Sequence, residues 1–100
     1  MVARVMVFAD IREGEEDKFI EAYKGVTAKV KGTKGHIRDE LLRQDGEQSK
    51  FILLSEWESK EDFLGWEDDE IHMATTTPMR PYWAGRVERI IYEVAARLDS

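Results

Sequence analysis

Residues 51–66 read Phe51-Ile-Leu-Leu-Ser-Glu-Trp-Glu-Ser-Lys-Glu-Asp-Phe-Leu-Gly-Trp66. The first four residues are apolar in succession, which is typical of a strand that is covered on both faces. Ser59 is a favoured helix N-cap, and acidic side chains follow it in what would be the first helical turn. The segment therefore predicts a strand that leads directly into a helix.

The sequence on either side continues this alternation of strands and helices. We expect strands over residues 3–9, 36–44, 50–56 and 85–94, and helices that begin near residue 15 and at residue 59. After a break, a helical continuation is expected over residues 68–75. Asp45-Gly46 is a strong hairpin signal, and Pro78 and Pro81 predict an irregular crossing before the last strand. The resulting β-α-β-β-α-β order is that of an α+β, ferredoxin-like fold.

The predicted strands differ in polarity, and the difference predicts their order in the sheet. Residues 5–8 and 51–54 are apolar in succession, whereas residues 36–44 and 85–94 carry several charges. Central strands are covered on both faces, while edge strands contact water, so we expect an antiparallel sheet in the order 4-1-3-2. Two helices cover only one face of such a sheet. We therefore expect a homodimer in which a second copy of the chain covers the other face.

The composition narrows the range of partners. The chain is long enough for one domain, over residues 1–100, and it contains 21 acidic and 15 basic residues but no cysteine. An acidic chain without a basic cluster argues against nucleic acid or an anionic membrane as a partner. The apolar start of the chain is short and interrupted by Arg4, which is unlike a signal peptide. We expect a cytoplasmic protein.

Three aromatic residues near the strand–helix junction are candidates for the wall of a binding site. Trp66 follows Phe63 by three residues and so shares its helix face, and Trp57 is expected to pack beneath the same helix. Aromatic residues at helical spacing belong more often to a core than to a ligand site. Both interpretations remain open for these three side chains.

The two histidines are candidates for acid–base chemistry. His72 lies three and four residues after Asp69 and Asp68, whose carboxylates would favour the imidazolium form on a helix. It is either a general acid or base, or a surface residue of a charged helix. His36 begins a polar strand and either faces a cavity or lies at a solvated strand end. The histidines do not have the spacing of a metal motif, so no metal is expected.

The segment Met79-Arg-Pro-Tyr-Trp83 gathers three further candidates. Arg80 could hold a phenolate, Tyr82 could hydrogen-bond to a carbonyl, and Trp83 could stack on an aromatic ring. Irregular segments commonly carry binding residues on a rigid scaffold. The alternative is that the two aromatic side chains cover the core while the guanidinium is solvated.

These features resemble the antibiotic biosynthesis monooxygenase (ABM) family. The resemblance rests on the element order, on Gly35 before the second strand, and on Trp57-Glu-Ser-Lys-Glu-Asp-Phe63 after the third. It implies a dimeric α+β barrel with a pocket between each sheet and its helices. It also implies oxygenation of an aromatic, polyketide-type substrate by O₂ without metal, flavin or haem, so no cofactor is expected.

The resemblance suggests roles for the candidate residues. An electron-rich phenol or anthrone, once deprotonated, can reduce O₂ itself, so the protein needs to bind it, deprotonate it and exclude water. His72 would serve as acid and base, and Arg80 and Tyr82 would stabilise the oxyanion. The residues expected to contact the substrate are Trp57, Phe63, Trp66, Trp83 and His36.

The chain departs from the family's pattern, and two other functions stay open. The polyketide oxygenases carry Asn at the position of Leu53 and Tyr at that of Phe63, so any catalytic residues must differ here. The haem-degrading branch is a weaker match, because Val7 replaces its first-strand Asn and its ligating His falls near Thr76. The alternative from another class is a non-catalytic or cyclase-like barrel that binds an aromatic ligand.

Overall fold

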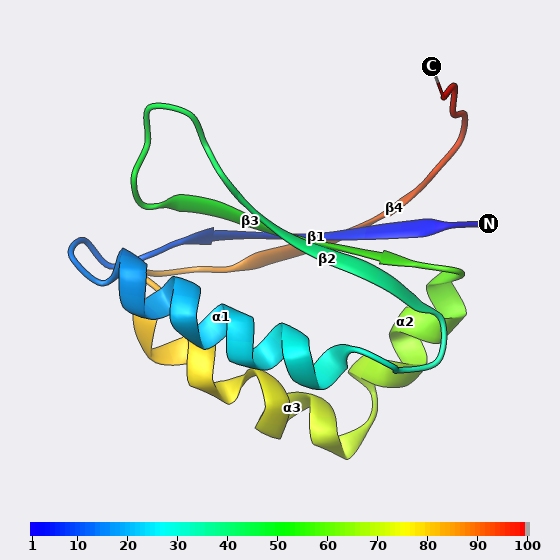
Figure 1. Cartoon of the computed structure of the whole chain (residues 1–100), viewed down its shortest axis with the longest axis horizontal. Coiled ribbons are helices and arrows are strands. Elements are labelled where there is room, and N and C mark those ends of the chain that lie inside the picture. The colour runs from blue at the N-terminus through cyan, green and yellow to red at the C-terminus, as the bar shows by residue number, and fades with distance from the viewer. Residues whose placement is uncertain (100) are drawn as a thin grey trace.

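The computed structural model describes residues 1–99. Its elements are β1 (Ala3–Asp10), α1 (Glu16–Val30), β2 (His36–Arg43), β3 (Lys50–Trp57), α2 (Lys60–Glu67), α3 (Glu70–Thr76), the 3₁₀ helix η1 (Thr77–Tyr82) and β4 (Glu88–Glu93). The strands form one antiparallel sheet in the order β2-β3-β1-β4 (Figure 1). This is the order 4-1-3-2 counted from the other edge, so the predicted α+β, ferredoxin-like fold is confirmed.

The two apolar strands, β1 and β3, occupy the centre of the sheet, and the charged strands β2 and β4 form its edges. β2 pairs with β3 through a register shift between His36 and Arg38. An extra residue of this kind bends a strand and redirects the side chains beyond it. After the shift, Asp39 lies opposite Ser55 and shares its side of the sheet. That side faces the helices, so a carboxylate is directed towards the interior.

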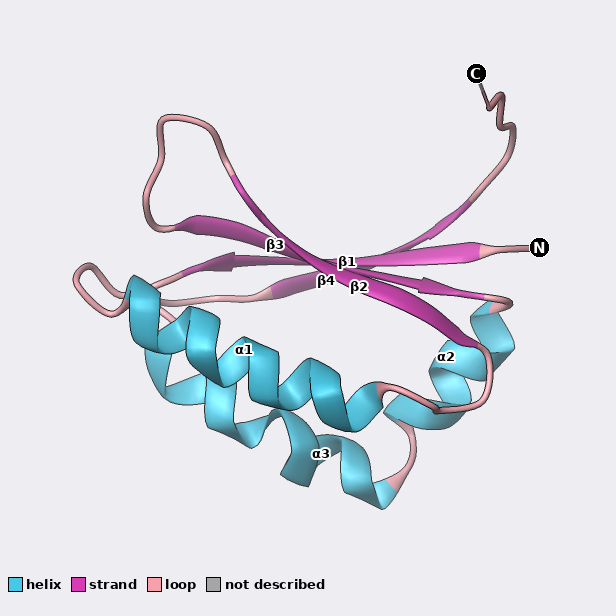
Figure 2. Ribbon diagram, viewed as in Figure 1, coloured by secondary structure: helices cyan, strands magenta, loops and turns pink. Residues whose placement is uncertain are grey.

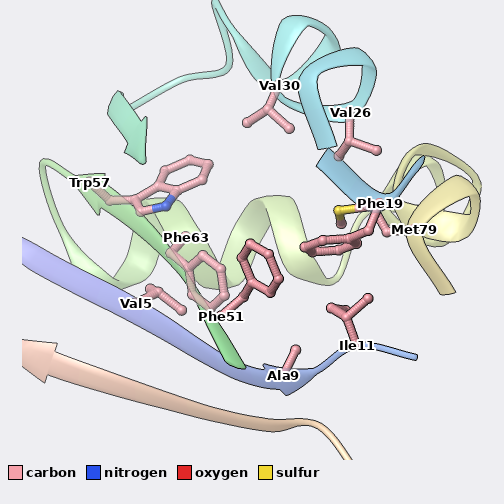
Figure 3. Packing of buried hydrophobic residues seen from close by; sticks show 10 residues of the cluster. All are labelled: Val5, Ala9, Ile11, Phe19, Val26, Val30, Phe51, Trp57, Phe63 and Met79. Atoms are coloured by element: carbon pink, nitrogen blue, oxygen red, sulfur yellow. The ribbon is translucent and has the colours of Figure 1, made fainter. Parts of the chain in front are cut away.

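All the helices lie on one side of the sheet (Figure 2). Apolar residues recur at three- and four-residue spacing along α1, and Phe19, Val26 and Val30 among them are buried against the strands. Figure 3 shows this layer, in which the rings of Phe19 and Phe51 meet edge to face with centroids 5.1 Å apart. The core is therefore a single layer between sheet and helices. Among residues 1–99, no helix is both long enough and apolar enough to cross a bilayer.

The helical segment after β3 has the predicted start and a break in its middle. The Ser59 hydroxyl accepts a hydrogen bond from the Asp62 N–H at 3.1 Å and so caps α2. α2 ends at Glu67, and the chain begins again as α3 after a new N-cap, Asp69. The break turns α3 so that it runs beside α1 (Figure 1).

Two predicted boundaries were wrong. Residues 77–82, expected to be irregular, form η1, because Pro78 stands in the first turn, where its missing N–H has no intrahelical partner to lose. β4 begins at Glu88 rather than at residue 85. Gly85 has a φ of +135°, which a strand does not accommodate, so the strand can start only beyond it.

The sheet side away from the helices carries apolar side chains and is here called the open sheet face. Side chains alternate along a strand, and residues paired across strands share a face. Its apolar members are Met6, Phe8, Leu42, Ile52, Leu54, Ile90 and Tyr92. Leu42 and Tyr92 are 40% and 42% exposed. No other part of residues 1–99 covers this face (Figure 2).

Candidate functional site

A cavity of about 310 Å³ lies between the sheet and the helices. Valines of β1 and α1 and Leu53 of β3 give it a mainly apolar lining. Cavities of this size, with apolar walls and a few polar groups, are typical of small-molecule sites. The polar groups on its walls therefore determine which ligand it fits.

One wall of the cavity is aromatic. Trp57 is fully buried, and its ring stacks on that of Trp66 with centroids 5.7 Å apart and an interplanar angle of 30°. Phe63 meets Trp57 edge to face, also at 5.7 Å (Figure 3). The indole N–H of Trp57 donates to the Ser55 hydroxyl at 3.0 Å, so its polar atom is satisfied within β3. The wall offers flat apolar surface to an aromatic ligand.

A row of polar residues forms another wall. His72, Thr76 and Arg80 recur every four residues from α3 into η1 and all line the cavity. The Arg80 Nη2 donates to the Thr76 hydroxyl at 3.1 Å, and this hydroxyl donates to the His72 carbonyl oxygen at 3.0 Å. The guanidinium also lies 5.2 Å from the centroid of the Trp83 ring. Contacts within one helical segment thus hold a cation near a histidine.

The environment of His72 favours the neutral imidazole. Its ring meets Trp66 edge to face with centroids 4.5 Å apart. Burial is the main cause that lowers the pKa of His72; the Glu67 carboxylate opposes this effect, and the Arg80 cation adds to it. The imidazole is therefore uncharged near pH 7 and can accept a proton.

The prediction that Asp68 and Asp69 favour the imidazolium was wrong. Asp69 is the N-cap of α3, and its carboxylate accepts a hydrogen bond from the Ile71 N–H at 3.0 Å. Asp68 is the C-cap of α2, so the two helices break between these residues and the assumed common helix face does not exist. Neither carboxylate is among the groups that shift the pKa of His72.

Three buried hydrogen-bond donors on the cavity wall have no partner in residues 1–99: Tyr23 Oη, Arg80 Nε and Trp83 Nε1. Buried donors are nearly always satisfied, because an unpaired one loses its hydration without compensation. All three belong to residues that line this one cavity. A ligand with acceptor oxygens would satisfy them.

A carboxylate network stands on the β2 side of the cavity. Asp39 accepts hydrogen bonds from His36 Nε2 at 2.8 Å and from the Thr27 hydroxyl. The same carboxylate acts on Tyr23, since burial and then the negative charge of Asp39 raise the pKa of Tyr23 to about 12. The tyrosine is therefore a neutral phenol that can donate a hydrogen bond.

An ion pair lies at the partly exposed rim. Arg89 of β4 binds Glu67 of α2 through two hydrogen bonds, Nη2 to Oε1 at 2.6 Å and Nε to Oε2 at 3.0 Å. Its guanidinium also lies 5.7 Å from the centroid of the Phe63 ring. This paired contact joins the sheet to the helix layer beside His72.

Six of the eight predicted site residues line the cavity: Trp57, Phe63, Trp66, His72, Arg80 and Trp83. The other two do not. His36 lies behind the wall, against Asp39 and edge to face with Trp57 at 5.1 Å. Tyr82 packs against the core, and its carbonyl accepts a hydrogen bond from the Arg12 N–H.

Sequence reasoning missed Tyr23, Asp39 and Thr76. Tyr23 follows Phe19 by four residues and precedes Val26 by three, a spacing typical of a core-facing helix stripe, although Thr27 one turn later signals a polar edge on that stripe. Thr76 lies four residues from both His72 and Arg80, and this spacing was visible in the sequence. Asp39 had no such signal, because the bulge that redirects it cannot be read from residue types.

The cavity brings together an apolar aromatic wall, a neutral base, a cation and spare donors. The two positions at which the chain departs from the polyketide oxygenases, Leu53 and Phe63, both line it. Among residues 1–99, no three His, Cys, Asp or Glu side chains lie close enough together to hold a metal ion. Such a site can bind an aromatic acid, remove its proton and hold the anion that results.

Comparison with known proteins gives one family and several relatives. A family model described as antibiotic biosynthesis monooxygenase matches residues 1–77. The chain is 34% identical over 82 residues to protein SchA of Streptomyces halstedii. It is 32% identical over 76 residues to the 42.8 kDa protein in the whiE locus of Streptomyces coelicolor. These matches cover 82% and 76% of the chain but only 22% and 19% of the two relatives.

Solved structures share the fold. SnoaB, a cofactor-independent oxygenase from Streptomyces nogalater, superposes with a TM-score of 0.81 at 17% identity, over 99% of this chain and 97% of its own. A conserved protein from Methanosarcina mazei superposes with a TM-score of 0.82 at 13% identity, over 92% and 91% of the two chains. At these identities the likeness is one of fold.

Proposed function

Because the chain belongs to the antibiotic biosynthesis monooxygenase family, we propose that it is a cofactor-independent monooxygenase. The substrate is a polycyclic aromatic compound, an anthrone or phenol of the polyketide type, and the oxidant is O₂. The observation that carries the proposal is the meeting of a neutral imidazole and a guanidinium with a free N–H in one aromatic-walled cavity.

His72 begins the reaction by taking a proton from the bound substrate. Its lowered pKa makes the imidazole neutral, and Glu67 beside it favours the imidazolium that then forms. Arg80 binds the oxygen on which the negative charge develops, since its Nε has no other partner. Thr76 holds the guanidinium in place. The aromatic wall orients the ring system and excludes water.

The substrate anion supplies the electrons that O₂ requires. One electron passes from the anion to O₂, and the substrate radical and superoxide combine to a peroxide on the ring carbon. In an anthrone the reacting carbon is a CH₂ group. The O–O bond breaks, one oxygen stays on that carbon as a ketone, and the other leaves as water with the two hydrogens of the CH₂ group. In a phenol the two hydrogens come from the ring C–H and the hydroxyl, and the product is a quinone. The four electrons that reduce O₂ all come from the substrate, so no external reductant takes part.

A second function is favoured by Leu53 and Phe63. Both stand on the cavity wall where the polyketide oxygenases have polar side chains. A cavity with fewer polar groups binds aromatic ligands equally well, but it has fewer groups that can stabilise the charge that develops when the substrate reacts with O₂. The alternative is therefore a binding or cyclising protein for an aromatic intermediate.

Oxygen uptake tests the proposal. Purified protein treated with a metal chelator would be given anthrone, with a no-protein control for spontaneous oxidation. We expect one O₂ consumed for each anthrone, and one labelled oxygen in the product under ¹⁸O₂. His72→Gln should lose the catalysed rate, whereas Tyr92→Phe, a change on the open sheet face, should keep it. Saturable anthrone binding without uptake above the control would refute the oxygenase and support the alternative.

We also propose that the protein is a homodimer with the two open sheet faces packed together. The support is the group of apolar side chains on that face, including Leu42 and Tyr92, which no segment of residues 1–99 covers. Sedimentation equilibrium would give the mass in solution. Leu54→Arg should yield a monomer, whereas Ile71→Arg, on the exposed surface of α3, should not. A wild-type monomer at micromolar concentration would refute the dimer.

A further inference from the structure

We propose that Tyr23 is a second anchor for the substrate, that it binds a neutral carbonyl oxygen, and that Asp39 keeps anionic oxygens away from it. The ligand then lies in one orientation, with its ionised oxygen at Arg80 and its ketone at Tyr23. This inference rests on the proposed function only in taking the cavity as the substrate site. It does not require turnover.

The Tyr23 hydroxyl has the properties of a ligand-binding donor. It is buried, it has no partner in residues 1–99, and its residue lines the cavity. The Thr27 hydroxyl, one helical turn away, donates to Asp39 and opposes the rise in the pKa of Tyr23, but Tyr23 Oη itself has no hydrogen-bond partner in residues 1–99. A buried unpaired hydroxyl is unfavourable, and an acceptor atom of a ligand would remove that penalty.

The charge around Tyr23 selects the kind of acceptor. The Asp39 carboxylate lies on the same wall, held by Thr27 and by His36 Nε2 at 2.8 Å. Burial and this carboxylate raise the pKa of Tyr23 to about 12, so the group donates but does not ionise. A phenolate or carboxylate placed here would meet a like charge, whereas a ketone oxygen would not.

The opposite preference holds at Arg80. Its guanidinium makes no ion pair with any carboxylate of residues 1–99, and its Nε and the neighbouring Trp83 Nε1 are both unpartnered. Two free donors beside an uncompensated cation favour an anionic oxygen. The substrate class that fits both ends is an aromatic compound with an ionisable hydroxyl and a separate ketone.

Two small ligands that differ in one group test the ketone contact. The probes are 4-hydroxybenzophenone and 4-benzylphenol, in which a methylene replaces the carbonyl. Binding would be measured by calorimetry at about pH 8.5, well above the ordinary pKa of an imidazole. Each ligand is compared with itself across the variants, so the different acidities of the two phenols cancel.

We expect Tyr23→Phe to raise the Kd of the ketone by about threefold to tenfold, because one hydrogen bond is lost. The same variant should raise the Kd of the methylene analogue by less than about twofold. The matched control Tyr92→Phe should change neither. Arg80→Gln should weaken both ligands. An equal effect of Tyr23→Phe on the two ligands, or none on the ketone, would overturn the inference.

The variants also separate this inference from the proposed function. If Arg80→Gln weakens both ligands while Tyr23→Phe does not discriminate between them, the cavity remains the site and only the second anchor is refuted. If Arg80→Gln spares both ligands, the cavity is not the site, and both proposals fail.

Asp39→Asn tests the charge selection. The probe is 4′-hydroxybiphenyl-4-carboxylate, which carries an anion where the first probe has a ketone. Removing the Asp39 charge should tighten its binding by at least about threefold, because a like charge nearby is lost. The same change should leave the Kd of 4-benzylphenol within about twofold. Unchanged carboxylate binding would refute the role of Asp39.

Discussion

Replacing Thr76 with valine removes one hydroxyl and keeps the side-chain shape. Thr76 is 8% exposed, and its hydroxyl accepts from Arg80 Nη2 at 3.1 Å while donating to the His72 carbonyl at 3.0 Å. Arg80 Nε already lacks a partner in residues 1–99. Valine would therefore leave a second nitrogen of this guanidinium without its contact, and the cation would lose its anchor on the cavity wall.

The expected loss in the free energy of unfolding follows from the charge of the donor in the Arg80–Thr76 hydrogen bond. A hydrogen bond to a charged group is worth about 1.5–3 kcal/mol, and the partial exposure of Arg80 reduces this value. Valine and threonine differ little in helix propensity, so that term is small. We expect the free energy of unfolding to fall by about 1–2 kcal/mol, or the Tm by about 5–10 °C for a domain of this size. Affinity for a phenolate should fall about tenfold.

Urea unfolding of five proteins measures the effect: the wild type, Thr76→Val, Thr75→Val, Arg80→Met and the double variant. The control is Thr75→Val, because Thr75 is equally buried at 7% but makes no side-chain hydrogen bond to Arg80. Thr76→Val is also made in an Arg80→Met background, where it should cost less than about 0.5 kcal/mol if the hydroxyl acts through the guanidinium. The same cost with and without Arg80 would refute the reasoning.

Four further predictions concern His72, its neighbour Glu67 and the aromatic wall. The rate of oxygen uptake should fall towards acid pH, with a midpoint below the ordinary imidazole pKa of about 6.5. His72→Gln should abolish this pH dependence. A midpoint above about 6.5 would contradict the lowered pKa of His72. Since the unfolded chain binds this proton more readily, stability should also decrease as the pH drops through that range, which urea unfolding at several pH values would measure. Glu67→Gln removes the carboxylate that favours the imidazolium, so the His72 midpoint followed by NMR should move lower still, and an upward movement would count against it. Trp57→Ala should cost about 3–5 kcal/mol in urea unfolding, because Trp57 is 0% exposed, and a loss below about 1 kcal/mol would be inconsistent with its place in the core.

The fold could be predicted because its signals are local and agree with one another. Consecutive apolar residues marked β1 and β3 as central, and Ser59 marked the start of α2. The prediction was less accurate for residues 77–82, where proline can indicate either an irregular segment or the first turn of a helix. Pro78 and Pro81 suggested an irregular crossing, yet a proline in the first turn is compatible with a 3₁₀ helix.

The candidate site could be predicted only in part, because only some of its residues carry a local signal. Trp57, Trp66, His72 and Arg80 were identifiable by residue type and spacing. Asp39 depends on a bulge in another strand, and its effect on Tyr23 depends on two elements meeting in space. The charge state of His72 failed as a prediction because it assumed that Asp68 and Asp69 belong to the same helix as His72, whereas they cap α2 and α3. Such properties arise from tertiary contacts, and residue spacing within one segment does not contain them.

The pairing of β4 with β1 has a consequence for folding during synthesis. β1 is made first, yet its neighbours in the sheet are β3 and β4, and β4 follows every other described element. A nascent chain that ends before residue 88 therefore leaves one edge of a central, apolar strand open to pairing with other chains. Contacts so distant in sequence also form slowly. Arg89 arrives with β4, so the rim of the cavity is completed only as the ribosome finishes this strand.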